Sequence, residues 1–168
     1  LAEFLRLGEG EIASGGAARI KEVQEVLLET ASSVEVRVTQ RYAAPADSVF
    51  DAWIDPAIAG GWLFATAWRP MSHVEIDARR GGSFRFADRW GAGCAGKSLE
   101  IARPRRLVFT LAEGECPTGV TRVSVEIVPL AAGCELNLIH EKIPPEHASR
   151  IEGRWTGMLY GLGTQLGT

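Results

Sequence analysis

The longest periodic pattern of the chain lies near its end, in residues 144–166. Apolar side chains recur there at spacings of three and four residues, which places them in one sector of a helix: Ile151, Trp155, Met158, Leu159, Leu162 and Leu166. Pro144 and Pro145 precede the pattern, and proline is tolerated in the first turn of a helix. The pattern therefore predicts a long C-terminal helix that needs a broad apolar surface against its apolar side.

A second stripe on this helix consists of Gly153, Gly157 and Gly161. A glycine inside a helix costs about 1 kcal/mol relative to alanine, so this helix depends on tertiary packing. The stripe faces away from the apolar side, and small residues permit another backbone to approach closely. We expect the helix predicted at residues 17–31, from this chain or from a second copy, to dock there.

Residues 34–38 alternate between valine and polar side chains, which predicts a strand with one solvent-exposed face. Two short helices should follow. Asp47 is the expected N-cap of the first, and Asp55-Pro56 separates it from the second. Residues 62–68 show no clear period and are expected to form a loop.

From residue 73 onward the pattern indicates strands separated by short turns, at residues 73–78, 83–86, 97–102, 106–111, 120–128 and 134–141. Gly81 and Gly82 supply the backbone freedom that a tight hairpin requires. Short connections between successive strands favour antiparallel pairing. We therefore predict an α+β fold in which a curved antiparallel sheet of about six to seven strands carries the C-terminal helix across its concave face.

The alternation assigns one apolar face of the sheet to the inside. Its members are Phe84, Phe86, Leu107, Phe109, Val123, Val125, Ile127, Leu136, Leu138 and His140. Together with the helix they could enclose a ligand cavity or simply fill a core, and periodicity is the same in both cases. His140 is the polar member of this set. It could hydrogen-bond a ligand or exchange protons with one, or it could be a structural histidine bonded near the strand end.

Composition and charge narrow the functional classes. The chain has 168 residues, 46% of them hydrophobic and 23% charged, with a net charge of −3. One domain is expected, with no membrane span and no basic surface for nucleic acid. The three cysteines and three histidines are scattered along the chain, so neither a metal site nor a cofactor is predicted. The same spacing of the cysteines indicates reduced thiols, which favour a cytoplasmic location.

Residues 1–33 differ from the rest. Glycine-rich breaks interrupt this segment, and Ile20, Val23, Val26 and Leu27 indicate an amphipathic helix within residues 17–31. We expect an N-terminal extension followed by a domain at residues 34–168. The extension could pack back on the domain, mediate a homodimer or end an upstream module.

Short motifs are spread over the domain. In chain order they are Ala44-Pro45, Val49-Phe50-Asp51-Ala52-Trp53, Asp55-Pro56, Trp62, Gly81-Gly82-Ser83-Phe84-Arg85-Phe86, Pro104-Arg105-Arg106-Leu107-Val108-Phe109-Thr110, Thr121-Arg122-Val123, His140-Glu141 and Trp155-Thr156-Gly157. Their order and spacing resemble the START-like (SRPBCC) superfamily, and within it the bacterial family similar to the C-terminal domain of the activator of heat-shock-protein-90 ATPase. The resemblance implies a helix-grip fold with a cavity between sheet and helix. Beside Trp62 this chain has Leu63-Phe64, where relatives usually carry a second tryptophan or a polar turn, which makes the expected pocket mouth more apolar.

Three functional hypotheses follow from the residues and the resemblance. The first is a domain that binds or carries a small apolar molecule, lined by Trp62, Phe84, Phe86, Phe109, His140, Trp155, Met158 and Leu162. The second is an enzyme resembling polyketide cyclases, with His140 and a hairpin carboxylate as acid and base. The third is a chaperone-associated stress-response module. Trp62, Trp68 and Trp90 lie outside periodic elements and could form an entrance or close the end of the core.

Overall fold

The computed structural model describes residues 33–65, 70–113 and 119–167. Residues 1–32 of the predicted extension, which include its helix at 17–31, lie outside the described residues, as does Trp68. The homodimer expected through the extension therefore stays a prediction. The boundary before residue 34 stays a prediction.

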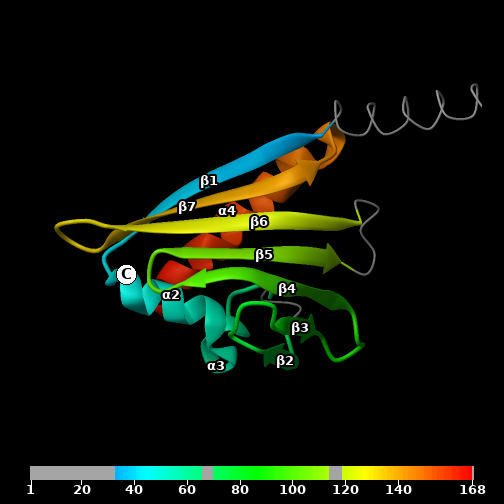
Figure 1. Cartoon of the computed structure of the whole chain (residues 1–168), viewed down its shortest axis with the longest axis horizontal. Helices are drawn as coiled ribbons and strands as arrows, with labels where there is room; N and C mark the ends of the chain where they lie inside the picture. The colour runs from blue at the N-terminus through cyan, green and yellow to red at the C-terminus, as the bar shows by residue number, and fades with distance from the viewer. Residues whose placement is uncertain (1–32, 66–69, 114–118, 168) are drawn as a thin grey trace, which may run out of the picture. The chain divides into compact units, whose positions relative to one another are not determined.

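Seven strands form one antiparallel sheet in the order β1-β7-β6-β5-β4-β3-β2 (Figure 1). Successive strands from β2 to β7 are neighbours, and β1 pairs with β7 at the far edge. The predicted α+β architecture is confirmed. The elements are β1 (Val34–Tyr42), α2 (Ala46–Ile54), α3 (Pro56–Ala59), β2 (His73–Ile76), β3 (Ser83–Ala87), β4 (Gly93–Ala102), β5 (Arg106–Glu113), β6 (Val120–Pro129), β7 (Cys134–Ile143), the 3₁₀ turn η1 (Pro145–His147) and α4 (Ala148–Gln165).

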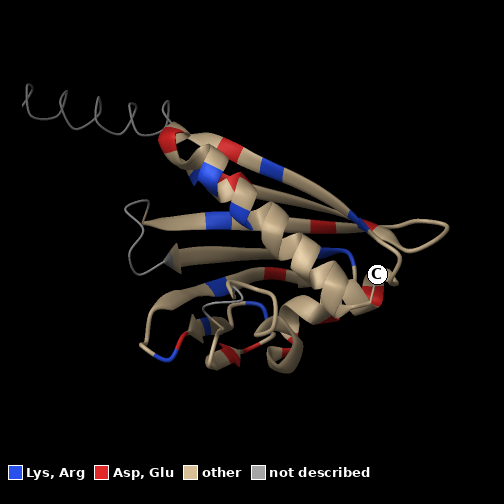
Figure 2. Ribbon diagram, turned by 180° about the vertical axis from the view of Figure 1, so that it is seen from behind, with Lys and Arg blue, Asp and Glu red and all other residues tan. Residues whose placement is uncertain are grey.

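The long helix α4 crosses one face of the sheet, as Figure 2 shows from behind. Its apolar side is buried at Ile151, Trp155, Leu159 and Leu162, while Met158 is half-buried. All ten sheet residues assigned to the inside are buried, so the predicted inward face is confirmed: Phe84, Phe86, Leu107, Phe109, Val123, Val125, Ile127, Leu136, Leu138 and His140. The sheet is thus the apolar surface that α4 requires.

The opposite face of the sheet is polar and carries cross-strand pairs. Opposite charges that face each other across strands contribute modestly and keep this face solvated. The pairs are Arg41 with Glu135 at 2.9 Å, Arg122 with Glu141 at 3.5 Å, Arg106 with Glu100 at 3.1 Å and with Glu126, and Thr39 with Asn137 at 2.9 Å.

Three boundary predictions were wrong. Asp47 is not the N-cap of α2, because Pro45 holds that position without a side-chain bond and Asp47 lies in the first turn. The α-helix expected from residue 144 begins at Ala148, after the 3₁₀ turn that the two prolines favour. Strand β4 begins at Gly93 instead of residue 97, because Gly93 already pairs with Ala87 of β3.

The glycine stripe faces away from the sheet, as expected. Gly153 and Gly157 are exposed, and a Cβ atom added at either would meet no atom of the described residues within 4 Å. The helix at 17–31 proposed to cover the stripe belongs to the part of the chain outside the described residues, so this docking stays a prediction.

Within the described ranges, no helix is both long and apolar enough to cross a membrane.

Candidate functional site

His140 lies near the end of β7 on the inward face and is only 4% exposed. The indole of Trp155, on α4, donates from Nε1 to His140 Nδ1 at 3.0 Å. On the other side of the ring, His140 Nε2 lies 2.7 Å from the Thr121 hydroxyl of β6. Sheet and helix are therefore joined by a polar relay inside an apolar interface.

The relay determines the protonation of the imidazole. Because Nδ1 accepts from Trp155, the proton of the neutral ring belongs on Nε2, which donates to Thr121 Oγ1. The Thr121 hydroxyl in turn donates to the Leu111 carbonyl at 3.2 Å. This chain of satisfied bonds is the structural role that the sequence left open for His140, and a proton exchange with a ligand would have to break it.

A first hollow lies beside this relay, under the first half of α4. Its volume is about 20 Å³, counted as the space open to the centre of a water molecule. The charged residues that line it among those described are Arg150 and Arg154, both basic, and Figure 2 shows them as the blue segments of α4. The full lining is Phe64, Leu111, Gly119, Thr121, His140, Ile143, Arg150, Ile151, Arg154, Trp155 and Met158.

A second hollow lies between α2 and the sheet and has the same volume of about 20 Å³. It is almost entirely apolar, and Ser98 is the polar residue of its lining apart from the Trp53 indole. Its members are Trp53, Ile54, Leu63, Phe64, Ile76, Phe84, Phe86, Ser98, Leu107 and Phe109. A space of this size holds about one water molecule, far less than the roughly 300 Å³ of a small-molecule pocket.

Phe64 belongs to the lining of both hollows. Its ring packs against Phe86 with centroids 5.2 Å apart and against Trp155 at 5.9 Å. Its backbone has φ of 59°, in the left-handed region, and its amide lies 3.2 Å from the Met158 sulfur. A bulky residue in this conformation stores about 1–3 kcal/mol of strain. Phe64 is thus a strained partition between the two spaces.

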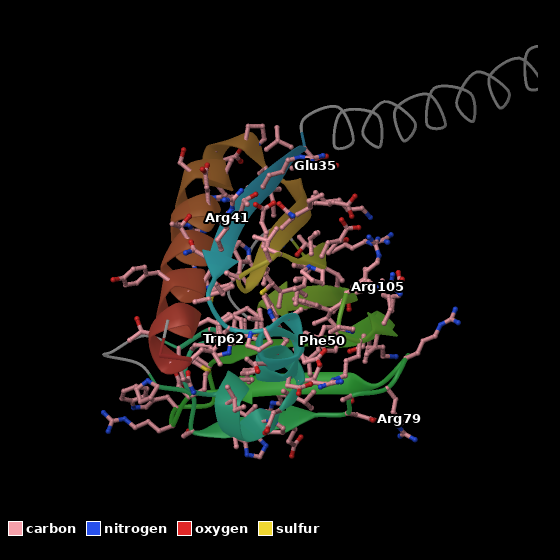
Figure 3. The ribbon with its side chains drawn as sticks, turned by 90° about the vertical axis from the view of Figure 1, so that its left-hand side faces the viewer. Glu35, Arg41, Phe50, Trp62, Arg79 and Arg105 are labelled. Carbon is pink, nitrogen blue, oxygen red and sulfur yellow. The ribbon has the colours of Figure 1, made fainter. Side chains whose placement is uncertain are left out.

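The structure separates the eight residues predicted to line one cavity. Phe84, Phe86 and Phe109 line the second hollow, whereas His140, Trp155 and Met158 line the first. Trp62 and Leu162 line neither. Both are buried, and Trp62 donates from Nε1 to the Ala52 carbonyl at 3.0 Å inside the core, where Figure 3 shows it.

Trp90 is 67% exposed at the tip of the turn between β3 and β4, with the Arg89 guanidinium 4.1 Å from its ring centroid. The buried Asp88 holds this turn, because its Oδ1 accepts from the amides of Trp90 at 2.8 Å and Ala92 at 3.0 Å. Of the three loop tryptophans, Trp62 therefore closes the core, Trp90 is presented to solvent, and Trp68 is outside the described residues.

One buried donor is unsatisfied within the described residues. The Trp53 Nε1 atom is fully enclosed and has no hydrogen-bond partner there, and the residue is 3% exposed. Leaving a buried donor without an acceptor costs about 1–3 kcal/mol. Trp53 lines the second hollow, so its side chain borders this space.

Sequence reasoning missed several residues of the site. Thr121 shares the parity of Val123 and could have been found by extending the alternation of β6 by two positions. Arg150 and Arg154 flank the apolar stripe of α4, which the helical period could also have indicated. The separating position of Phe64 depends on a loop conformation that has no periodic signal. Within the described residues, no three His, Cys, Asp or Glu side chains gather as metal ligands.

Comparison with known proteins agrees with this architecture. Residues 43–167 match the family described as Activator of Hsp90 ATPase homolog 1-like protein. No curated protein matches the chain. Among solved structures the chain is similar to CalU16 from Micromonospora echinospora, with 25% identity, a TM-score of 0.64 and coverage of 79% of this chain and 76% of that one.

Two further structures extend the likeness. An AHSA1-like protein from Aeromonas hydrophila is 19% identical with a TM-score of 0.67, and the alignment covers 79% of this chain and 92% of that chain. PFC0360w from Plasmodium falciparum, described as an HSP90 activator, is 23% identical with a TM-score of 0.62 and coverage of 79% and 96%. At these identities the structures show the fold, which is the helix-grip fold expected from the motifs. Because the family match spans most of the described domain, the chain belongs to the Activator of Hsp90 ATPase homolog 1-like family.

Proposed function

We propose that this domain binds a small, mainly apolar molecule between the sheet and α4, in the space that its two hollows form together when Phe64 moves. The observation that carries the proposal is the position of Phe64 in the lining of both hollows. Each hollow alone accommodates about one water molecule. A ligand of useful size therefore requires the partition to be displaced.

The backbone of Phe64 supports such a displacement. Its φ of 59° is unfavourable for a side chain of this size, so release of the segment recovers part of the energy needed to move the ring. The contacts that hold the ring in place are aromatic packing with Phe86 and Trp155. A flat apolar ligand can replace such packing with contacts of the same kind.

Binding can be tested with N-phenyl-1-naphthylamine, an uncharged dye that fluoresces in apolar surroundings. Phe64→Gly removes the ring and suits the positive φ, so this variant should stay folded. We expect it to bind the dye about tenfold more tightly than the natural sequence, because no ring has to be displaced. Phe64→Ala tests the same step with the strain retained.

Phe50→Ala is the matched control for a cavity elsewhere in the core. Phe50 is fully buried, but it lines neither hollow. The proposal fails if neither the natural chain nor Phe64→Gly binds the dye, or if Phe50→Ala improves binding as much as the Phe64 variants do.

The geometry gives less support to an enzyme of the polyketide-cyclase kind. Both ring nitrogens of His140 are engaged, by Trp155 and by Thr121. A general acid or base must reach its substrate directly or through one water molecule. We therefore favour binding without catalysis.

A role beside a chaperone is the second candidate, and family membership is the observation that favours it. The family description names an activator of the Hsp90 ATPase. The ATPase rate of the chaperone from the same source, measured with and without this chain, tests this function independently of ligand binding. An unchanged rate together with no co-purification would dispose of it.

A further inference from the structure

The indole of Trp53 differs from the other buried indoles among the described residues. Trp62 donates to a backbone carbonyl at 3.0 Å and Trp155 donates to His140 at 3.0 Å. Trp53 Nε1 is equally enclosed but has no such acceptor among those residues. Buried indole N–H groups normally find a partner, so the difference calls for a functional account.

The surroundings of Trp53 offer it only weak acceptors. Its ring lies perpendicular to that of Trp62 at 4.7 Å and tilted to those of Phe109 at 6.2 Å and Trp155 at 6.1 Å. Aromatic faces accept N–H groups far more weakly than oxygen does. Trp53 also lines the second hollow, so an oxygen atom of a ligand seated there would lie against the Trp53 side chain.

We propose that the second hollow is a subsite for a neutral hydrogen-bond acceptor, such as a ketone, ester or amide carbonyl within an otherwise apolar ligand, and that Trp53 Nε1 donates to it. This inference rests on the proposed binding function and adds the chemical class of the ligand. Among the described residues, the lining of the second hollow contains no charged side chain, so a carboxylate there would be buried without a counter-charge from them. A carbonyl oxygen avoids that cost, and the Ser98 hydroxyl is a second polar group of the lining.

The experiment compares two probes of nearly equal shape, acetophenone and cumene, which differ in the carbonyl oxygen. The sequence contains five tryptophans, so ¹H–¹⁵N spectra resolve a small set of indole signals, and Trp53→Phe assigns one of them. We expect acetophenone to move the Trp53 signal downfield, as a new hydrogen bond does, and cumene to leave it nearly unchanged. Trp62 and Trp155, already bonded within the protein, provide internal references.

Affinity supplies the second measurement. Displacement of the dye from Phe64→Gly gives the ratio of the affinities for acetophenone and cumene. Trp53→Phe in the same background should shift this ratio about tenfold toward cumene, the value of about one buried hydrogen bond. Trp90→Phe, at an exposed ring, should leave the ratio unchanged.

The outcomes separate this inference from the function on which it rests. Displacement of the dye by both probes, with no specific response of the Trp53 signal to acetophenone, would overturn the inference and leave the binding function intact. A ratio that survives Trp53→Phe would also overturn it, because the donor would then be another group. If neither probe nor the dye binds, both proposals fail.

Discussion

Replacement of His140 by leucine tests the relay between β7 and α4. The side chain is similar in size but cannot accept from Trp155, whose indole donor is then buried without its imidazole partner. A buried unpaired donor costs about 1–3 kcal/mol. The Thr121 hydroxyl loses its contact with His140 but keeps its bond to the Leu111 carbonyl, so the lost contact costs about 1 kcal/mol. We expect the free energy of unfolding to fall by about 2–4 kcal/mol.

Urea titration followed by circular dichroism measures this change, with the midpoint falling while the slope stays constant. The thermal midpoint should fall by about 2–4 °C for each kcal/mol. His73→Leu is the matched control: this histidine is solvent-exposed in β2, and its replacement should change stability by less than about 0.5 kcal/mol. A His140→Leu variant as stable as the natural chain would refute the structural role of the relay and make His140 available again as a ligand-binding group.

Three further predictions concern the scaffold. The guanidinium of Arg103 lowers the pKa of Asp51 by a hydrogen bond, so Arg103→Gln should lower stability slightly at neutral pH, and urea titrations should show that difference vanishing as the pH falls well below about 4. Burial raises the pKa of Tyr42, so its contribution to stability should be complete below a pH of about 10 and decline above it. Thermal scans at increasing pH should show a smaller alkaline decline for Tyr42→Phe. Gly153→Ala with Gly157→Ala should stabilise α4 by about 1–2 kcal/mol in urea, and a loss instead would show that another segment packs on the stripe.

The sequence predicted most of the fold because burial of one face leaves a periodic record. Phe84 and Phe86 in β3, and Ile151 and Trp155 in α4, were assigned to the inside from spacing alone, and all four are buried. Boundaries were less accurate, because local turn chemistry determines them. Asp47 illustrates this, because this good capping residue lies two positions after Pro45, which is the N-cap and makes no side-chain bond.

The candidate site was predicted in its members but not in its arrangement. Alternation put His140 on the inward face, yet only the packed structure shows Trp155 on one ring nitrogen and Thr121 on the other. These partners are remote in sequence, and their distances depend on how α4 lies over the sheet. No local pattern specifies that crossing.

The sequence by itself determined the α+β class, the inward face of the sheet and the apolar side of α4, because each follows from the backbone period of its own element. The tertiary structure decided whether the enclosed space is open or filled. Side chains from α2, the following loop and the sheet meet there. Phe64 divides the space, and Trp53 lines one part of it with an indole donor that has no acceptor within the described residues. The volume of the enclosed space and the hydrogen-bond partners of its buried groups depend on how distant elements pack together, so no single element determines them.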